Sequence, residues 1–160
     1  KPMLIVLNVG DDGVDEAAEQ FSYSHQESRV IGLHGRLESE IAQLDDESRQ
    51  LFLEEYDISE PGLNRVIRES YNLLGLQSFF TVGEDEVRAW TVRRGANAVE
   101  AAGVIHSDLA RGFIRAEVVH YDDLVDCGSL PEAKNRGVLR LQGKEYGVRD
   151  GDVMNVRFNV

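Results

Sequence analysis

The side chains best suited to bind a ligand follow two short apolar runs near the start of the sequence. The run 3–7 (MLIVL) leads into NVGDDG at 8–13, and the run 29–33 (RVIGL) leads into HGRLE at 34–38. Such runs are typical of strands that helices bury on both faces, and we expect the two runs to lie side by side as parallel neighbours. Open α/β sheets bind ligands at the carboxyl ends of their strands, so the two polar loops together form a candidate site. Taken alone, NVGDDG is more often a surface turn.

Few other residues suggest catalysis or metal binding. His106 stands two residues before Asp108, but no nucleophile or metal-ligand set lies nearby at a recognisable spacing, and a histidine at a helix end more often bonds to the backbone. The acidic segment 44–47 (LDDE) is interpreted as a helix cap and solvated face rather than a magnesium site. The other histidines are too scattered for zinc: His25, His34 and His120. We therefore predict no catalytic residue and no metal ligand here.

The sequence also lacks the motifs that handle nucleotide phosphates. No GxxxxGK(S/T) occurs at any position, so the glycine-rich phosphate cradle and its lysine are missing. No segment that would hold Mg²⁺ or position water for phosphoryl transfer is present either. We expect this chain alone to hydrolyse no nucleotide and to bind one weakly.

The stretch 87–119 has the pattern of a strand, a helix and a second strand. Residues 87–94 and 113–119 alternate at period two. Between them, apolar residues recur every three or four positions, which predicts one helix over 97–111, capped by Asn97 and stopped by Gly112. Its apolar stripe comprises Ala98, Ala101, Ala102, Ile105 and Leu109. Further strands must close a sheet over this helix. We expect them at 139–147 and 152–160, joined through Asp150-Gly151.

The remaining elements are predicted from apolar spacing and caps. A helix is expected over 14–28. Helices are expected through 38–76, with Asp45 or Asp46 capping one of them, Ser59-Glu60-Pro61 opening the next and Gly75 ending the last. Residues 120–137 are predicted as a strand end, a short helical turn and an irregular loop.

Charge and composition divide the 160-residue chain. Its net charge is −12, with 6 Lys and Arg against 16 Asp and Glu in residues 1–77 and 11 against 13 in residues 78–160. The asymmetry favours two units, and the acidity argues against DNA or general phosphate binding. A local basic set remains a candidate for contact with RNA or a protein partner: Arg88, Trp90, Arg93 and Arg94. For Trp90 itself, packing in the core is the more common role.

Two further features bear on the setting of the protein. Cys127 is the only cysteine, and no apolar run approaches the length of a membrane span, so a reducing cytoplasm is expected and a membrane is not. The buried-strand pattern at 3–7 needs more parallel neighbours than the later sequence offers. We infer that the sequence is a fragment of a longer protein.

Three segments of the sequence resemble a known family. VRAWTVRRG at 87–95, AAGVIHSDLARGFIRAEV at 101–118 and DGDVMNVRFNV at 150–160 are similar, almost residue for residue, to the C-terminal domain of the YchF or Obg-like ATPase family. IHSDL, GFIRAEVV and the final strand also resemble the TGS domain, a ubiquitin-like β-grasp module. The likeness extends through nearly the whole chain.

The resemblance implies a fold class and a function. It implies an α+β chain, with the C-terminal α/β and helical part of a P-loop NTPase domain at 1–76 and a TGS (β-grasp) domain at 77–160. It implies a parent protein that hydrolyses ATP or GTP with Mg²⁺, works in the cytoplasm and docks on the ribosome, on its large subunit. The alternative is a non-enzymatic β-grasp module that binds RNA or protein. The absence of a P-loop upstream would favour that alternative.

The resemblance also assigns base-contacting residues. NVGD stands where the family carries NxxE in place of the NKxD motif of GTPases, and this implies that Asn8, Val9 and Asp11 contact the base. HGRLE stands where the family's backbone lies beside the base, and this implies a contact from Gly35. Asp11 replaces the family's Glu, and a carboxylate there pairs with the two N–H donors of guanine in GTPases. We retain ATP as the expected nucleotide because the family resemblance implies it, and we keep GTP as an alternative because of Asp11.

Overall fold

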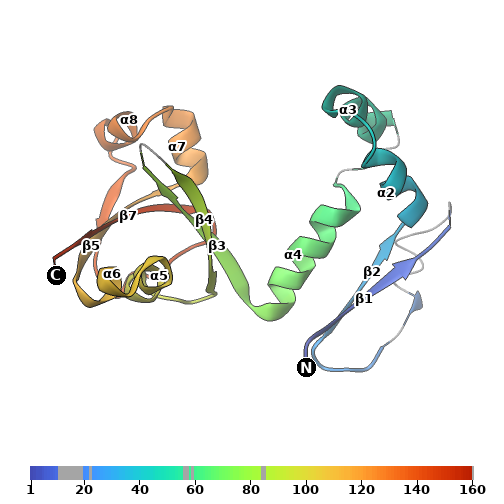
Figure 1. Cartoon of the computed structure of the whole chain (residues 1–160), viewed down its shortest axis with the longest axis horizontal. Coiled ribbons are helices and arrows are strands. Elements are labelled where there is room, and N and C mark those ends of the chain that lie inside the picture. The colour runs from blue at the N-terminus through green and yellow to red at the C-terminus, as the bar shows by residue number, and fades with distance from the viewer. Residues whose placement is uncertain (11–19, 22, 56–57, 59, 84–85, 160) are drawn as a thin grey trace. The chain divides into compact units, whose positions relative to one another are not determined.

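The chain forms two compact units, residues 1–74 and 75–160. The computed structural model describes residues 1–10, 20–21, 23–55, 58, 60–83 and 86–159. The fold mixes α and β structure, as the sequence predicts, and each unit has its own sheet (Figure 1).

The first unit contains a pair of parallel strands and three helices among its described residues. The strands are β1 (Met3–Asn8) and β2 (Ser28–Leu33), in register from Met3 opposite Ser28 to Asn8 opposite Leu33. The predicted parallel pairing is therefore confirmed. The helices are α2 (Gly35–Ile41), α3 (Asp46–Glu55) and α4 (Gly62–Leu74). Because the strands run side by side in the same direction, the loops after both lie at one edge of the sheet (Figure 1).

Two expectations for this unit need correction. Residues 14–19 and 22 of the helix expected over 14–28 lie outside the described residues, but 23–27 is not helical and Ser28 begins a strand. The Ser28 hydroxyl donates to the His25 carbonyl at 2.7 Å, and such local side-chain bonds favour a turn over a helix. The helices expected through 38–76 are present as three separate helices, but Leu76, placed in the last of them, belongs to the next strand.

The cap between the first two of these helices matches the prediction. The Asp45 carboxylate accepts a 2.8 Å hydrogen bond from the backbone N–H of Ser48, and this bond lowers the pKa of Asp45. Ser59 lies outside the described residues, and α4 begins directly after Pro61. Gly75 follows α4 with a left-handed φ of 63°, which suits glycine at a helix end.

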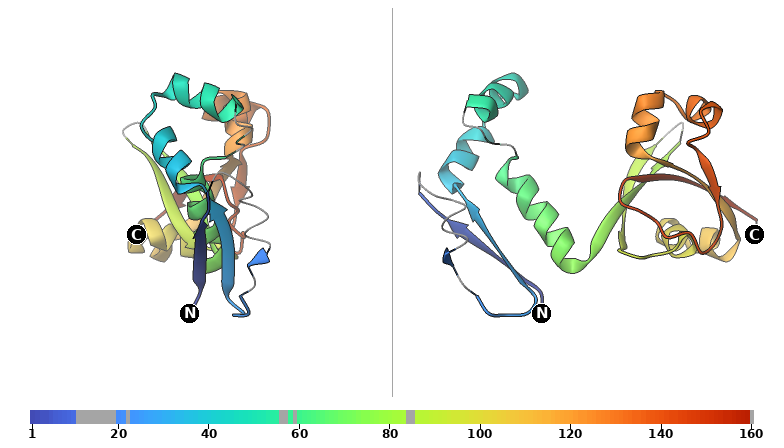
Figure 2. Two further views of the ribbon diagram at one scale, coloured as in Figure 1. Left: turned by 90° about the vertical axis from the view of Figure 1, so that its right-hand side faces the viewer. Right: turned by 180° about the vertical axis from the view of Figure 1, so that it is seen from behind.

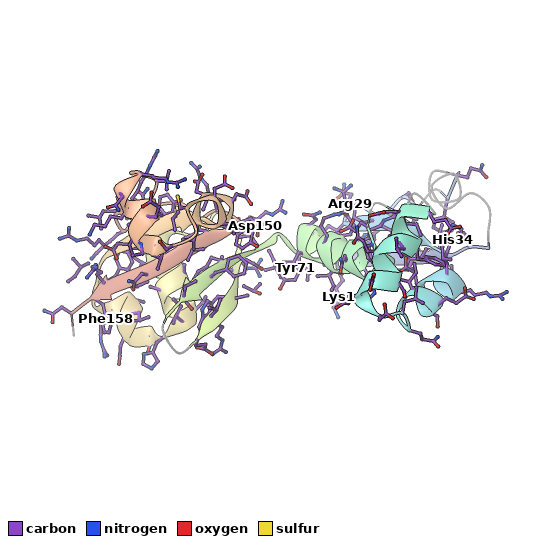
Figure 3. All side chains as sticks on the ribbon, turned by 90° about the horizontal axis from the view of Figure 1, so that it is seen from above. Lys1, Arg29, His34, Tyr71, Asp150 and Phe158 are labelled. Atoms are coloured by element: carbon purple, nitrogen blue, oxygen red, sulfur yellow. The ribbon has the colours of Figure 1, made fainter. Side chains whose placement is uncertain are left out.

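The second unit is built on a five-stranded mixed sheet of order β4-β3-β7-β5-β6. Strands β3 and β7 are parallel, and the other neighbours are antiparallel. In Figure 3, Asp150 and Phe158 lie near opposite ends of β7. The strands are β3 (Leu76–Val82), β4 (Val87–Arg93), β5 (Phe113–His120), β6 (Arg140–Gln142) and β7 (Asp152–Phe158).

One face of this sheet carries the main core of the unit. Helix α5 (Ala98–Ile105) buries three alanines against side chains from four strands, including the fully buried Phe79 and Met154. Asn97 caps the helix as predicted, with its side chain accepting from Glu100 N–H while the Glu100 carboxylate accepts from Asn97 N–H.

The single helix predicted over 97–111 is two helices. His106 is extended (φ −162°, ψ 142°), ends α5 and caps α6 (Ser107–Arg111). Ile105 and Leu109 both pack on the same core, so the apolar stripe runs across the break and hides it from a periodicity argument. Gly112 ends α6 as expected.

A second, smaller core lies on the opposite face of the sheet, beneath α7 (Tyr121–Cys127) and α8 (Leu130–Asn135) (Figure 2). Helix α8 replaces the irregular loop expected there. Its first turn is capped by Ser129, which accepts from Glu132 N–H, and contains Pro131. The strand expected over 139–147 is only Arg140–Gln142, because the chain turns at Gly143, whose carbonyl accepts from Tyr146 N–H.

Candidate functional site

Asn8 and Gly35 join the two loops at the carboxyl edge of the parallel strands. The Asn8 side-chain oxygen accepts a hydrogen bond from the Gly35 backbone N–H at 3.0 Å. A Cβ at position 35 would lie 2.7 Å from that oxygen, so glycine is needed for this approach. Among the described residues the Asn8 Nδ2 group has no hydrogen-bond partner, and Asn8 is exposed. Two N–H donors are therefore available to a ligand at this edge.

The other base-loop residues extend the same edge. Val9 is half-buried, and its N–H donates to the Leu33 carbonyl at 2.9 Å, which continues the strand pairing by one residue. Arg36 forms an exposed ion pair with Glu40 at 3.3 Å. Asp11 lies outside the described residues, so its contact with a base stays a prediction.

A second long-range bond holds the segment after β2, and no local pattern in the sequence predicts it. The Glu38 carboxylate accepts from Gly62 N–H, the first residue of α4, at 2.7 Å. Gly62 is buried, and a Cβ there would stand 2.5 Å from Leu33 Cδ2. Glu38 thus caps a helix 24 residues away and fixes α2, which carries Gly35.

The basic set on β4 does not form one patch. Alternation along the strand puts Arg88 and Trp90 on one face and Arg93 on the other. Trp90 is half-buried against the main core, and its Nε1 donates to Thr81 Oγ1 at 2.9 Å. The Arg88 guanidinium lies 4.2 Å from the Trp90 ring centroid, a cation–π contact that covers the ring.

Arg93 and Arg94 lie together at one hollow beside the end of β4. Both line a cavity of about 510 Å³ between β4 and α5, together with Val104 and Glu100. Arg94 Nε also donates to the Leu76 carbonyl at 3.3 Å. Arg93 therefore presents its charge on the sheet surface beside an apolar wall, whereas Arg94 is partly committed to the backbone.

The remaining candidates have structural contacts. His106 Nδ1 accepts from Asp108 N–H at 3.2 Å, the helix-end role expected for it. Across the described parts of the chain, no three His, Cys, Asp or Glu side chains gather as a metal site would need. Within the same residues no helix has the length and apolarity to cross a bilayer.

The comparisons with known proteins agree on one family. Residues 76–159 match the family model YchF-GTPase_C, described as a protein of unknown function (DUF933). The ribosome-binding ATPase YchF of Bacillus subtilis (strain 168) is 51% identical, over 100% of this chain and 46% of the relative. The corresponding protein of Haemophilus influenzae is 48% identical, over 100% and 45%. The chain thus spans less than half the length of these curated relatives.

Two solved structures are similar in fold. The structure of the Schizosaccharomyces pombe YchF GTPase matches with a TM-score of 0.77 and 28% identity, over 98% of this chain and 43% of that one. The crystal structure of a GTP binding protein from Pyrococcus horikoshii OT3 matches with a TM-score of 0.62 and 18% identity, over 99% and 46%, which supports the fold alone. The resemblance found in the sequence is confirmed, and the chain belongs to the YchF-GTPase_C family.

Proposed function

We propose that this chain belongs to a ribosome-associated nucleotide hydrolase and supplies its base-recognition loops and its docking domain. The names of the relatives, ribosome-binding ATPases and a GTPase, support the class. The chain has no P-loop, so hydrolysis and Mg²⁺ binding would use residues outside it. The observation that carries the proposal is the bond between Asn8 and Gly35.

The chemistry of the loop edge fits a purine. Asn8 keeps an amide donor pair exposed, and both purines present an acceptor at N7, so this group would orient either base. Gly35 admits no side chain without displacing Asn8, which leaves room for a flat ring beside the backbone. These contacts bind a base without choosing between adenine and guanine.

The choice of base is assigned to Asp11. A carboxylate accepts two hydrogen bonds from guanine N1–H and its amine, which adenine does not offer. We expect Asp11→Glu in the full-length protein that carries this chain to weaken GTP more than ATP, measured by titration of both nucleotides, with Asp12→Glu as the control. Equal effects on the two nucleotides would remove Asp11 from base reading.

Residues 1–76 are proposed as the C-terminal part of a nucleotide-binding domain, and residues 77–160 as a TGS domain of the β-grasp type. Renumbered within the second unit, the sheet order is 2-1-5-3-4, with the first and last strands parallel and α5 packed across one face. This arrangement is the one expected of a ubiquitin-like β-grasp, and it supports the assignment.

The second unit is proposed to dock on the ribosome in the cytoplasm. The docking site would lie on the large subunit and would consist of RNA or protein. The candidate contacts are Arg88, Trp90, Arg93 and Arg94. Arg93 fits best, because it is exposed on the sheet surface, whereas the Trp90 ring is covered. Relatives named as ATPases weigh against the alternative of a non-enzymatic module. Measuring ATP hydrolysis by the full-length protein distinguishes the two, because a non-enzymatic binding module would hydrolyse no ATP.

A further inference from the structure

A second cavity lies in the second unit, at the β6 side of the sheet, and it has no part in the proposal above. Its volume is about 320 Å³, and its walls come from β5, β6, the start of α7 and the loop before β7. Three valines form its apolar side, two of them buried to 4% and 2% exposure: Val118, Val119 and Val138. A hollow of this size is at the small end of the range for small-molecule sites.

Two guanidinium groups line this cavity. Arg140 stands on β6 opposite Val118 of β5, and Arg149 precedes β7. Neither has a carboxylate within 4.0 Å among the described residues, whereas Arg136 and Arg157 of the same unit are both paired with glutamates. Two exposed cations without ion pairs thus share one hollow.

A buried carboxylate in the wall of this cavity already has its hydrogen-bond partners. Asp152, only 2% exposed, accepts from the Tyr146 hydroxyl at 2.9 Å and from the Arg149 backbone N–H at 2.8 Å. Burial and this bond to Asp152 raise the pKa of Tyr146 to about 12, so the hydroxyl remains a donor. These bonds fix the Tyr146 ring and the Arg149 backbone in place before any ligand arrives.

His120 lines the cavity, but both of its ring nitrogens already have partners, so it offers no free donor to a ligand. Its Nδ1 accepts from Asp122 N–H at 3.4 Å, and its Nε2 lies 3.1 Å from the Asp150 carbonyl, which only accepts. The ring is therefore held at both nitrogens. Asp123 is exposed and also lines the cavity, and it forms no side-chain hydrogen bond or ion pair among the described residues.

We propose that this cavity binds the phosphate group of a small phosphorylated molecule through Arg140 and Arg149. Guanidinium groups form paired hydrogen bonds to phosphate oxygens, and the apolar wall strengthens the attraction by excluding water from one side. The volume of about 320 Å³ is that of a small-molecule site. Asp123 opposes the anion and limits its affinity.

The test uses the full-length protein that carries this chain, labelled with ¹⁵N and titrated with inorganic phosphate, AMP and adenosine. We expect phosphate and AMP, but not adenosine, to shift the amide signals of the lining residues. Arg140→Gln and Arg149→Gln are each expected to weaken AMP binding about tenfold, which is the usual loss for one charge-assisted bond. Arg115→Gln, an exposed arginine of β5 outside the cavity, should leave it unchanged.

Asp123→Asn gives a result of opposite sign, a several-fold gain in AMP affinity, which no folding defect would produce. The proposal is overturned if adenosine shifts the lining residues as strongly as AMP, or if millimolar phosphate and AMP shift none of them. It is also overturned if Arg115→Gln weakens AMP binding at the lining residues as much as Arg149→Gln. Shifts caused only by an RNA oligonucleotide without terminal phosphates would overturn it too. No residue before 77 enters the site, so its failure would leave the base-site proposal standing.

Discussion

The side-chain oxygen of Asn8 lies 3.0 Å from the backbone nitrogen of Gly35, 27 residues later in the chain. This bond joins the loops that follow two parallel strands, and it uses the acceptor of the amide while leaving its donors at the edge of the sheet. Glu38 reinforces the second loop by capping α4 at Gly62. Side chains and backbone at this edge are therefore fixed before a ligand binds, which reduces the entropy lost on binding.

Gly62 and Gly103 are predicted to respond to alanine in opposite directions. At Gly62 a Cβ meets Leu33 Cδ2 at 2.5 Å and Glu38 Oε1 at 2.7 Å, so Gly62→Ala should destabilise the first unit by about 1–3 kcal/mol. At Gly103, within α5, a Cβ makes a 3.4 Å contact with Ala110, and Gly103→Ala should stabilise the second unit by about 0.5–1 kcal/mol. Urea unfolding measures both, and a loss at position 103 would contradict the packing described.

The half-buried Asn97 should contribute more to the stability of its unit than an exposed asparagine does. Asn97→Ala removes the acceptor for two backbone N–H groups of α5 and is expected to cost about 1 kcal/mol in urea unfolding. Asn135→Ala, whose side chain makes only a 3.5 Å contact with Glu132, is the control and should cost less than about 0.5 kcal/mol. Equal losses of unfolding free energy in the two variants would mean that the Asn97 cap does not stabilise α5.

Tyr146 should make stability fall at alkaline pH. Its pKa is raised from 10.0 to about 12, first by burial and then by the bond to Asp152, so the folded state favours the protonated hydroxyl. The contribution is complete below pH 10 and is lost as the pH rises towards about 12. The difference in unfolding free energy between the parent and Tyr146→Phe should therefore shrink over that interval. Tyr121→Phe serves as the control, and a constant Tyr146 difference would refute the assignment.

Arg93 is predicted to contribute to ribosome docking. We expect Arg93→Glu in the full-length protein to weaken cosedimentation with ribosomes about tenfold at low salt, and the effect should diminish as salt rises. Arg115→Glu introduces the same charge change at another exposed strand position and should act much less. If both substitutions act alike, the loss reflects net charge and not a contact made by Arg93.

Local patterns in the sequence predicted much of this fold. The apolar runs 3–7 and 29–33 required parallel partners, and β1 and β2 provide them for each other. Asn97 and Asp45 carry the side chains that cap helices, and both do so. The strand runs and the caps could be predicted because each depends on residues within a few positions of one another, and the pairing of the two strands follows from their shared buried-strand pattern.

Features that depend on distant residues were not predictable in the same way. The bond from Gly62 to Glu38 spans 24 residues, and no sequence pattern near either residue predicts it.

The sequence pattern did not predict the break between α5 and α6 at His106, because Ile105 and Leu109 pack on one core across it. Helix α8 did have a local signal, since Ser129 and Pro131 are good residues for a first helical turn, but the surrounding polar sequence favoured a loop.

The most direct test of the base site compares two ligands that differ in whether they carry a base. The affinity of the full-length protein for ATP and for tripolyphosphate is measured in the parent, in Asn8→Ala and in the control Asn135→Ala. Because Asn8 is proposed to contact only the base, Asn8→Ala should weaken ATP about tenfold and leave tripolyphosphate unchanged. Unchanged ATP affinity, or an equal loss for both ligands, would contradict the account.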